Sequence, residues 1–91
     1  MKYIVEDFRI YLVNDEGNIL AFVTFPPVEE NVVMLNHTYV DNSLRGQGIA
    51  SVLLEKAYEK IKQSNFKVIP SCSYAVKWFE KHEDRQDVVK K

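Results

Sequence analysis

The stretch that decides the fold is Tyr39–Leu54, which reads YVDNSLRGQGIASVLL. It begins at the end of a β-forming run, continues through a polar segment with two glycines, and ends in helix-forming residues. Apolar side chains then recur at every fourth position, which places them on one stripe of a helix. The members of this stripe are Ile49, Leu53, Ala57 and Ile61. The sequence therefore predicts a strand, a glycine-containing loop and an amphipathic helix in direct succession.

The residues upstream of this stretch predict antiparallel strands. Two β-forming runs, Phe8–Val13 and Ile19–Phe25, flank the turn Asn14–Asn18 and together predict a hairpin. The pair Pro26–Pro27 should end the second strand, because proline cannot donate to a β-ladder. A third strand is expected at Val32–Val40, and its length suggests a bulge or a splay.

The residues downstream predict one more strand and a second helix. Ser64–Asn65 should end the first helix, Phe66–Ile69 reads as a short strand, and Ser71–Ser73 offers hydroxyl N-caps. The second helix is indicated by Ala75, Trp78 and Phe79. The order β-β-β-α-β-α predicts an α+β fold, a mixed sheet of about four to five strands with two helices packed on it. A right-handed crossover should make the third and fourth strands parallel.

Length and composition restrict the class of protein. The chain has 91 residues, enough for a single domain with a thin core, so a second copy of the chain is a candidate partner. Twelve basic and 13 acidic residues give a net charge of −1, which provides no electrostatic reason to expect nucleic acid or an anionic membrane as partner. One cysteine excludes an internal disulfide and a thiolate-rich metal site, and we expect no metal. The N-terminus lacks the apolar core of a signal peptide, so we expect a cytoplasmic protein.

The loop before the first helix has the chemistry of an anion site. The first N–H groups of a helix have no internal partner, and the helix dipole adds positive charge there. Small residues at Gly46, Gly48 and Ala50 let a diphosphate approach these groups, and Arg45 adds a cation. The alternative is a glycine-containing turn that merely starts a helix. The spacing fits neither a P-loop nor a dinucleotide-binding fingerprint.

The pattern Arg45-x-x-Gly48-x-Ala50 resembles the pyrophosphate-binding signature of the GNAT acetyltransferase superfamily. The resemblance extends from Phe8 to about Val89. The segments Asn36–Val40 and Pro70–Tyr74 are similar to the minimal, single-domain branch of that superfamily. The resemblance implies one GNAT-like domain over residues 1–91.

The resemblance also implies a ligand and site residues. The ligand is acetyl-CoA, used as acyl donor, and the acceptor is an unidentified amine. The pyrophosphate would be held by main-chain groups of Arg45, Gly46, Gln47, Gly48, Ile49 and Ala50. Main-chain groups of Tyr39 and Val40 would bind the pantetheine, and Cys72 and His37 would lie near the thioester as catalytic residues.

Two alternatives stay open for each catalytic candidate. Cys72, between a strand and a helix, is either a nucleophile favoured by the helix N-terminus or a buried small hydrophobe. His37 is either a general base or a hydrogen-bonded strand residue. In one mechanism Cys72 takes the acetyl group with His37 as base, and in the other the amine attacks acetyl-CoA directly.

Larger members of the superfamily wall the acceptor site with two helices between their first strands, where this chain has only the turn Asn14–Asn18. The open acceptor side favours the competing interpretation, a non-catalytic CoA-binding or protein-interaction module. A helix-turn-helix DNA-binding protein is a third, weaker alternative, because only one good helix follows the turn and the net charge is −1.

Overall fold

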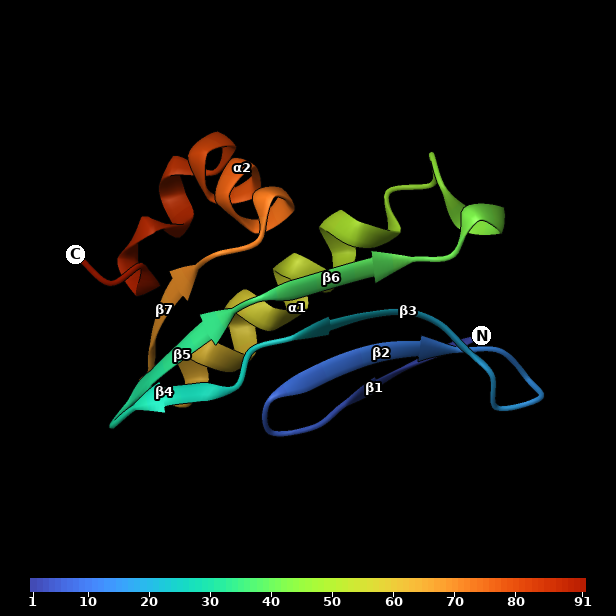
Figure 1. Ribbon diagram of the computed structural model, residues 1–91, viewed down its shortest axis with the longest axis horizontal. Coiled ribbons are helices and arrows are strands. Elements are labelled where there is room, and N and C mark those ends of the chain that lie inside the picture. The colour runs from blue at the N-terminus through green and yellow to red at the C-terminus, as the bar shows by residue number, and fades with distance from the viewer.

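The computed structural model describes residues 1–91 as two small sheets with two α-helices packed against them (Figure 1). The fold is α+β, as the sequence predicts. The elements are β1 (Lys2–Val5), β2 (Arg9–Val13), β3 (Ile19–Thr24), β4 (Pro27–Glu29), β5 (Val32–Leu35), β6 (His37–Val40), the 3-10 turn η1 (Asn42–Leu44), α1 (Ile49–Gln63), β7 (Lys67–Pro70), α2 (Ser73–Lys81) and the 3-10 segment η2 (Glu83–Val88).

The first sheet has four strands in the order β1-β2-β3-β6. Its β2–β3 hairpin confirms the prediction, and Gly17 supplies the positive φ of +85° in the turn. The strand β1, which pairs antiparallel with β2, was not predicted from the sequence. Alternation places one set of side chains of β2 and β3 in the core, on the face that α1 covers. These buried residues are Ile10, Leu12, Ala21 and Val23.

The predicted third strand is divided at Asn36 into β5 and β6, which belong to different sheets. The second sheet has the order β4-β5-β7, and β5 and β7 are parallel, as expected for the strands joined by the crossover. The proline pair ends β3, but Pro27 begins the additional strand β4. Proline is tolerated there because β4 is an edge strand and needs no N–H donor on its free side.

The helices follow the predicted stripes closely. Leu53, Ala57 and Ile61 of α1 are fully buried, and Ala75, Trp78 and Phe79 of α2 are buried. Two polar contacts reinforce this packing: Trp78 Nε1 donates to Ser51 Oγ at 3.1 Å, and Arg85 of η2 pairs with Glu55 of α1. Glu55 therefore helps to attach η2 to α1.

The separation of the two sheets creates a split beside the start of both helices. β6 is an edge strand, paired only with β3, while β7 pairs with β5 and leads into α2. Figure 1 shows β6 and β7 diverging beyond the end of β5, with α2 on one side of the split and the loop to α1 at the end of β6.

Candidate functional site

The loop between β6 and α1 presents free backbone donors. Gly46 and Gly48 take φ values of +85° and +75°, a region that residues with a Cβ adopt only with strain. Gly48 is the N-cap of α1 and offers no side chain to bond the first turn. The N–H groups of residues 49–51 therefore have no partner within the chain. No acidic side chain stands in that first turn either, so this helix start is open to an anion.

Asp41 shapes the approach to this loop. Its carboxylate accepts hydrogen bonds from Ser43 Oγ at 2.5 Å and from Ser43 N at 3.0 Å. The hydrogen bond from the Ser43 hydroxyl, followed by that from the Ser43 amide, holds the pKa of Asp41 below its usual value. The carboxylate is therefore ionised at neutral pH and caps η1.

A hollow of about 210 Å³ lies over the glycine loop. It includes six of the predicted binding residues: Val40, Arg45, Gly46, Gly48, Ile49 and Ala50. Gln47 and Tyr39 do not line it. Leu44 and Tyr74 complete the wall. Sequence reasoning did not assign Tyr74, whose only signal is its position just inside the second helix, two residues after Cys72.

The free edge of β6 presents main-chain groups to the split. Asp41 N donates to Leu20 O at 2.8 Å, so the main-chain groups of Asp41 turn toward β3. Along an antiparallel strand, the main-chain N–H and C=O groups of every second residue point to the same side, so those of Tyr39 also point toward β3. The main-chain groups of Thr38 and Val40 turn toward the free edge. Of the two residues expected to bind the pantetheine, Val40 turns its main-chain groups to the free edge and Tyr39 does not.

Cys72 is the N-cap of α2, and its sulfur accepts from Ala75 N at 3.4 Å. The expected hydroxyl cap is thus a thiol, since Ser71 Oγ instead donates to Leu35 O at 3.3 Å. Thr38 Oγ1 lies 3.5 Å from Cys72 Sγ across the split. Cys72 is half-buried and directly joins the start of α2 to β6.

His37 does not face Cys72, which corrects the expected pairing. Its exposed ring stacks on Phe22 with 5.4 Å between ring centroids, and Tyr39 stacks on the same Phe22 at 5.5 Å. Successive side chains of a strand point to opposite faces, so the contact of Thr38 with Cys72 places His37 on the uncovered face of the sheet. The division of the strand at Asn36 sets which residues of β6 point to the uncovered face.

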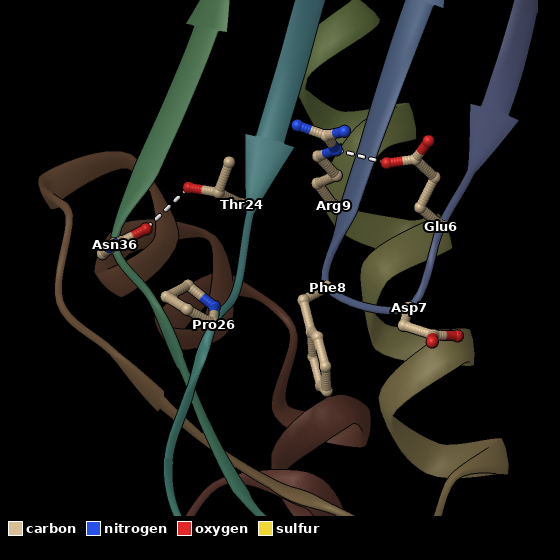
Figure 2. A pocket seen from close by; sticks show the side chains of 7 residues that line it. All are labelled: Glu6, Asp7, Phe8, Arg9, Thr24, Pro26 and Asn36. Atoms are coloured by element: carbon tan, nitrogen blue, oxygen red, sulfur yellow. Dashed lines mark hydrogen bonds and ion pairs between the residues drawn. The ribbon is translucent and has the colours of Figure 1, made fainter.

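A larger hollow of about 510 Å³ lies away from the loop, between the turn that joins β1 to β2 and the end of β3 (Figure 2). Figure 2 shows a Glu6–Arg9 ion pair on one side of this hollow. On the other side, Thr24 Oγ1 donates a hydrogen bond of 2.6 Å to Asn36 Oδ1. Hydrogen bonds from Arg9 and then Tyr11 hold the pKa of Glu6 below its usual value. None of the predicted site residues lines this hollow, so its size alone does not make it the site.

No group of three or more His, Cys, Asp or Glu side chains is arranged to hold a metal ion. No helix has both the length and the apolar character needed to cross a membrane.

Comparison with known families identifies the chain. A sequence model of the GCN5-related N-acetyl-transferase family matches residues 8–88. The chain belongs to the GCN5-related N-acetyltransferase family, as the resemblance of its Arg45–Ala50 motif indicated.

Solved structures agree with this assignment. The NMR structure of a protein assigned as a GCN5-like N-acetyltransferase from Staphylococcus aureus is 35% identical, with a TM-score of 0.80, and the match covers 98% of this chain and 87% of that one. YhbS from Escherichia coli, crystallised in complex with CoA, is 23% identical with a TM-score of 0.65, over 76% of this chain and 42% of YhbS. GCN5 from Tetrahymena is 10% identical with a TM-score of 0.66, over 91% of this chain and 59% of that chain. At these sequence identities, the similarities to YhbS and to Tetrahymena GCN5 show a shared fold only.

Proposed function

We propose that this protein is an acetyl-CoA-dependent N-acetyltransferase that moves an acetyl group from the CoA thioester to an amine. The observation that carries the proposal is the uncapped start of α1, where the N–H groups of residues 49–51 follow a loop with Arg45 and two glycines. A helix N-terminus of this kind suits a diphosphate. Family membership and the CoA bound to the similarly folded YhbS support CoA as the carrier of the acyl group.

The pantetheine arm of the ligand would run from the loop along the free edge of β6. The main-chain groups of Val40 and Thr38 would bind its amides. This path leads toward Cys72, which lies 3.5 Å from the Thr38 hydroxyl. The thioester would thus lie in the split between β6 and the start of α2.

Two routes of transfer fit this placement. In the direct route the neutral amine attacks the thioester carbonyl, the C–S bond breaks, and the CoA thiolate leaves while a base or water accepts the amine proton. In the covalent route the Cys72 thiolate attacks first and releases CoA, and the amine then displaces Cys72 from the acyl-enzyme. His37 would serve as a base only for an amine arriving over the uncovered face of the sheet, because it does not face Cys72.

A CoA-binding module without turnover is the second candidate. It is favoured by the bare acceptor side, where only the turn of residues 14–18 joins β2 to β3 and no helix intervenes. Both candidates require the same ligand at the loop, and they differ only in whether an amine is acetylated.

Calorimetric titration with acetyl-CoA, followed by mass spectrometry after incubation with a panel of primary amines, tests both candidates. Saturable binding and an acetylated amine support the transferase. Binding without any acetylated product supports the module. A titration without heat of binding overturns both. Intact mass of the protein, with and without Cys72→Ala, distinguishes the routes, because only the covalent route adds one acetyl unit to the parent chain.

A further inference from the structure

A second hollow adjoins the one over the glycine loop and is formed by α1 and α2. Its volume is about 230 Å³. We name it the α1–α2 groove, and its lining residues are Ser51, Tyr74, Lys77, Trp78, Lys81 and His82. Tyr74, which is 40% exposed, lines both hollows and so forms the wall between them. A ligand that lies over the loop therefore has this groove as an immediate neighbour.

The groove is lined by cations and by no carboxylate. Lys77 and Lys81 are exposed, lie one turn apart on the same side of α2, and take part in no ion pair within the chain. By contrast, Lys60, Lys62 and Lys90 are each paired with an acidic side chain elsewhere. Two free ammonium groups side by side favour an anion at this position.

The floor of the groove is formed by Trp78 and His82. Trp78 is 4% exposed and bonds Ser51, which ties α2 to α1 beneath the lysines. His82 stacks on Trp78 with ring centroids 4.1 Å apart, and its Nδ1 lies 2.6 Å from Trp78 O. A carbonyl oxygen only accepts, so Nδ1 carries the proton and Nε2 is the ring nitrogen left for other contacts.

The other neighbour of the glycine loop has the opposite charge. Asp41 is ionised at neutral pH and lies at the end of β6, just before the loop. A phosphate on that side would meet a carboxylate, whereas a phosphate on the α2 side would meet Lys77 and Lys81. The charge distribution therefore favours a second phosphate on the α2 side of the loop over one on the Asp41 side.

We propose that the α1–α2 groove binds the 3′-phosphate of the CoA ribose through Lys77 and Lys81, and that it makes the protein prefer CoA over 3′-dephospho-CoA. This inference rests on the proposed function, because CoA must first be held at the glycine loop. The phosphate monoester is one ribose away from the diphosphate, which matches a groove separated from the loop hollow by a single side chain, Tyr74.

The test is a comparison of two ligands that differ only in the 3′-phosphate. Binding of CoA and of 3′-dephospho-CoA is measured by calorimetry at low ionic strength for the parent chain and for the double variant Lys77→Ala/Lys81→Ala. The parent should bind CoA about tenfold more tightly, since two exposed ion pairs to a phosphate contribute at about this level. The double variant should lose this preference while its affinity for 3′-dephospho-CoA stays unchanged.

The control variant is Lys2→Ala/Lys91→Ala, which removes the same charge from two exposed lysines that line neither hollow. It should keep the parent's preference. Equal affinity of the parent for the two ligands, or an equal loss of both ligands in the double variant, would overturn the assignment of the groove but not the proposed function. Failure of the parent to bind either ligand would overturn the proposed function and this inference with it.

Discussion

The two helices begin on either side of the same split, yet their first turns are completed in different ways. α1 begins at Gly48, in the left-handed region and without a side-chain cap. α2 begins at Cys72 in extended conformation, and its sulfur accepts from Ala75 N. The start of α1 therefore keeps free donors that an anion can take, while the start of α2 is closed by a group that can also react. One helix start thus has donors free for a ligand, whereas the first turn of the other is already capped within the chain.

The largest expected effect is on the open helix start. Gly48→Val places a branched Cβ at a φ of +75°, in space where no atom of the chain lies within 4 Å but where the diphosphate would sit. Affinity for CoA should fall by about 3 kcal/mol or more, the value of two charged hydrogen bonds. The strain itself should lower the free energy of unfolding by about 1–2 kcal/mol. Calorimetric titration and urea unfolding measure the two effects.

Gly17→Val is the matched control for that variant. Gly17 has a φ of +85° and equally free surroundings, but it lies in the β2–β3 turn. This variant should show a similar loss of stability and an unchanged affinity for CoA. If it weakened CoA binding as much as Gly48→Val, the loss would reflect strain and the anion site would be wrong.

A smaller effect is expected from the cation of the same loop. Arg45→Ala should weaken CoA binding by about 1–3 kcal/mol, because a charged hydrogen bond to the diphosphate is lost. Arg45 is exposed, so the free energy of unfolding should stay within about 0.5 kcal/mol of the parent value. Chemical-shift mapping with CoA checks the location, and an absence of shifts between residues 40 and 51 would contradict it.

The closed helix start is tested by two substitutions of one residue. Cys72→Ser keeps a capping atom and should leave stability nearly unchanged, whereas Cys72→Ala removes the cap and should cost about 0.5–1 kcal/mol. If Cys72 is the nucleophile, both variants should lose acetyl transfer while still binding CoA. Full activity of Cys72→Ala would restrict the thiol to its structural role as a cap.

The smallest expected effect concerns pH and the approach to the open helix start. Hydrogen bonds from Ser43 lower the pKa of Asp41 in the folded chain below its usual value. A lowered folded pKa means that this stabilisation is present above the unfolded pKa and is lost as the pH falls through the folded one. Urea unfolding between about pH 7 and pH 2.5 measures this effect. As the pH falls, the free energy of unfolding should decrease less for Asp41→Asn than for the parent. Parallel curves for the two proteins would show that the carboxylate does not cap η1.

Several features of this protein follow from local sequence. The alternation of residues 8–13 and 19–25 predicted the β2–β3 hairpin, and the stripe from Ile49 to Ile61 predicted α1 and its buried face. The glycine loop was identified together with most of the residues that line its hollow. These predictions succeed because periodicity, positive φ and helix termini are properties of neighbouring residues.

The position of His37 relative to Cys72 could not be derived in the same way. Whether His37 or Thr38 faces Cys72 depends on side-chain parity, and parity changes where a long strand kinks between two sheets. The sequence from Val32 to Val40 is β-forming throughout and does not mark Asn36 as the point of division. The pairing of β4 with β5 and of β6 with β3 decides it.

The sequence by itself therefore determined the class of fold, the helix stripe and the glycine loop before α1, because each depends on residues that are close together in the chain. Only the tertiary structure decided which face His37 occupies and that Lys77 and Lys81 line a groove next to the hollow over the loop. Both depend on how segments distant in the sequence are packed, because the distance between such segments is set by the shared core and by strand register rather than by local conformation.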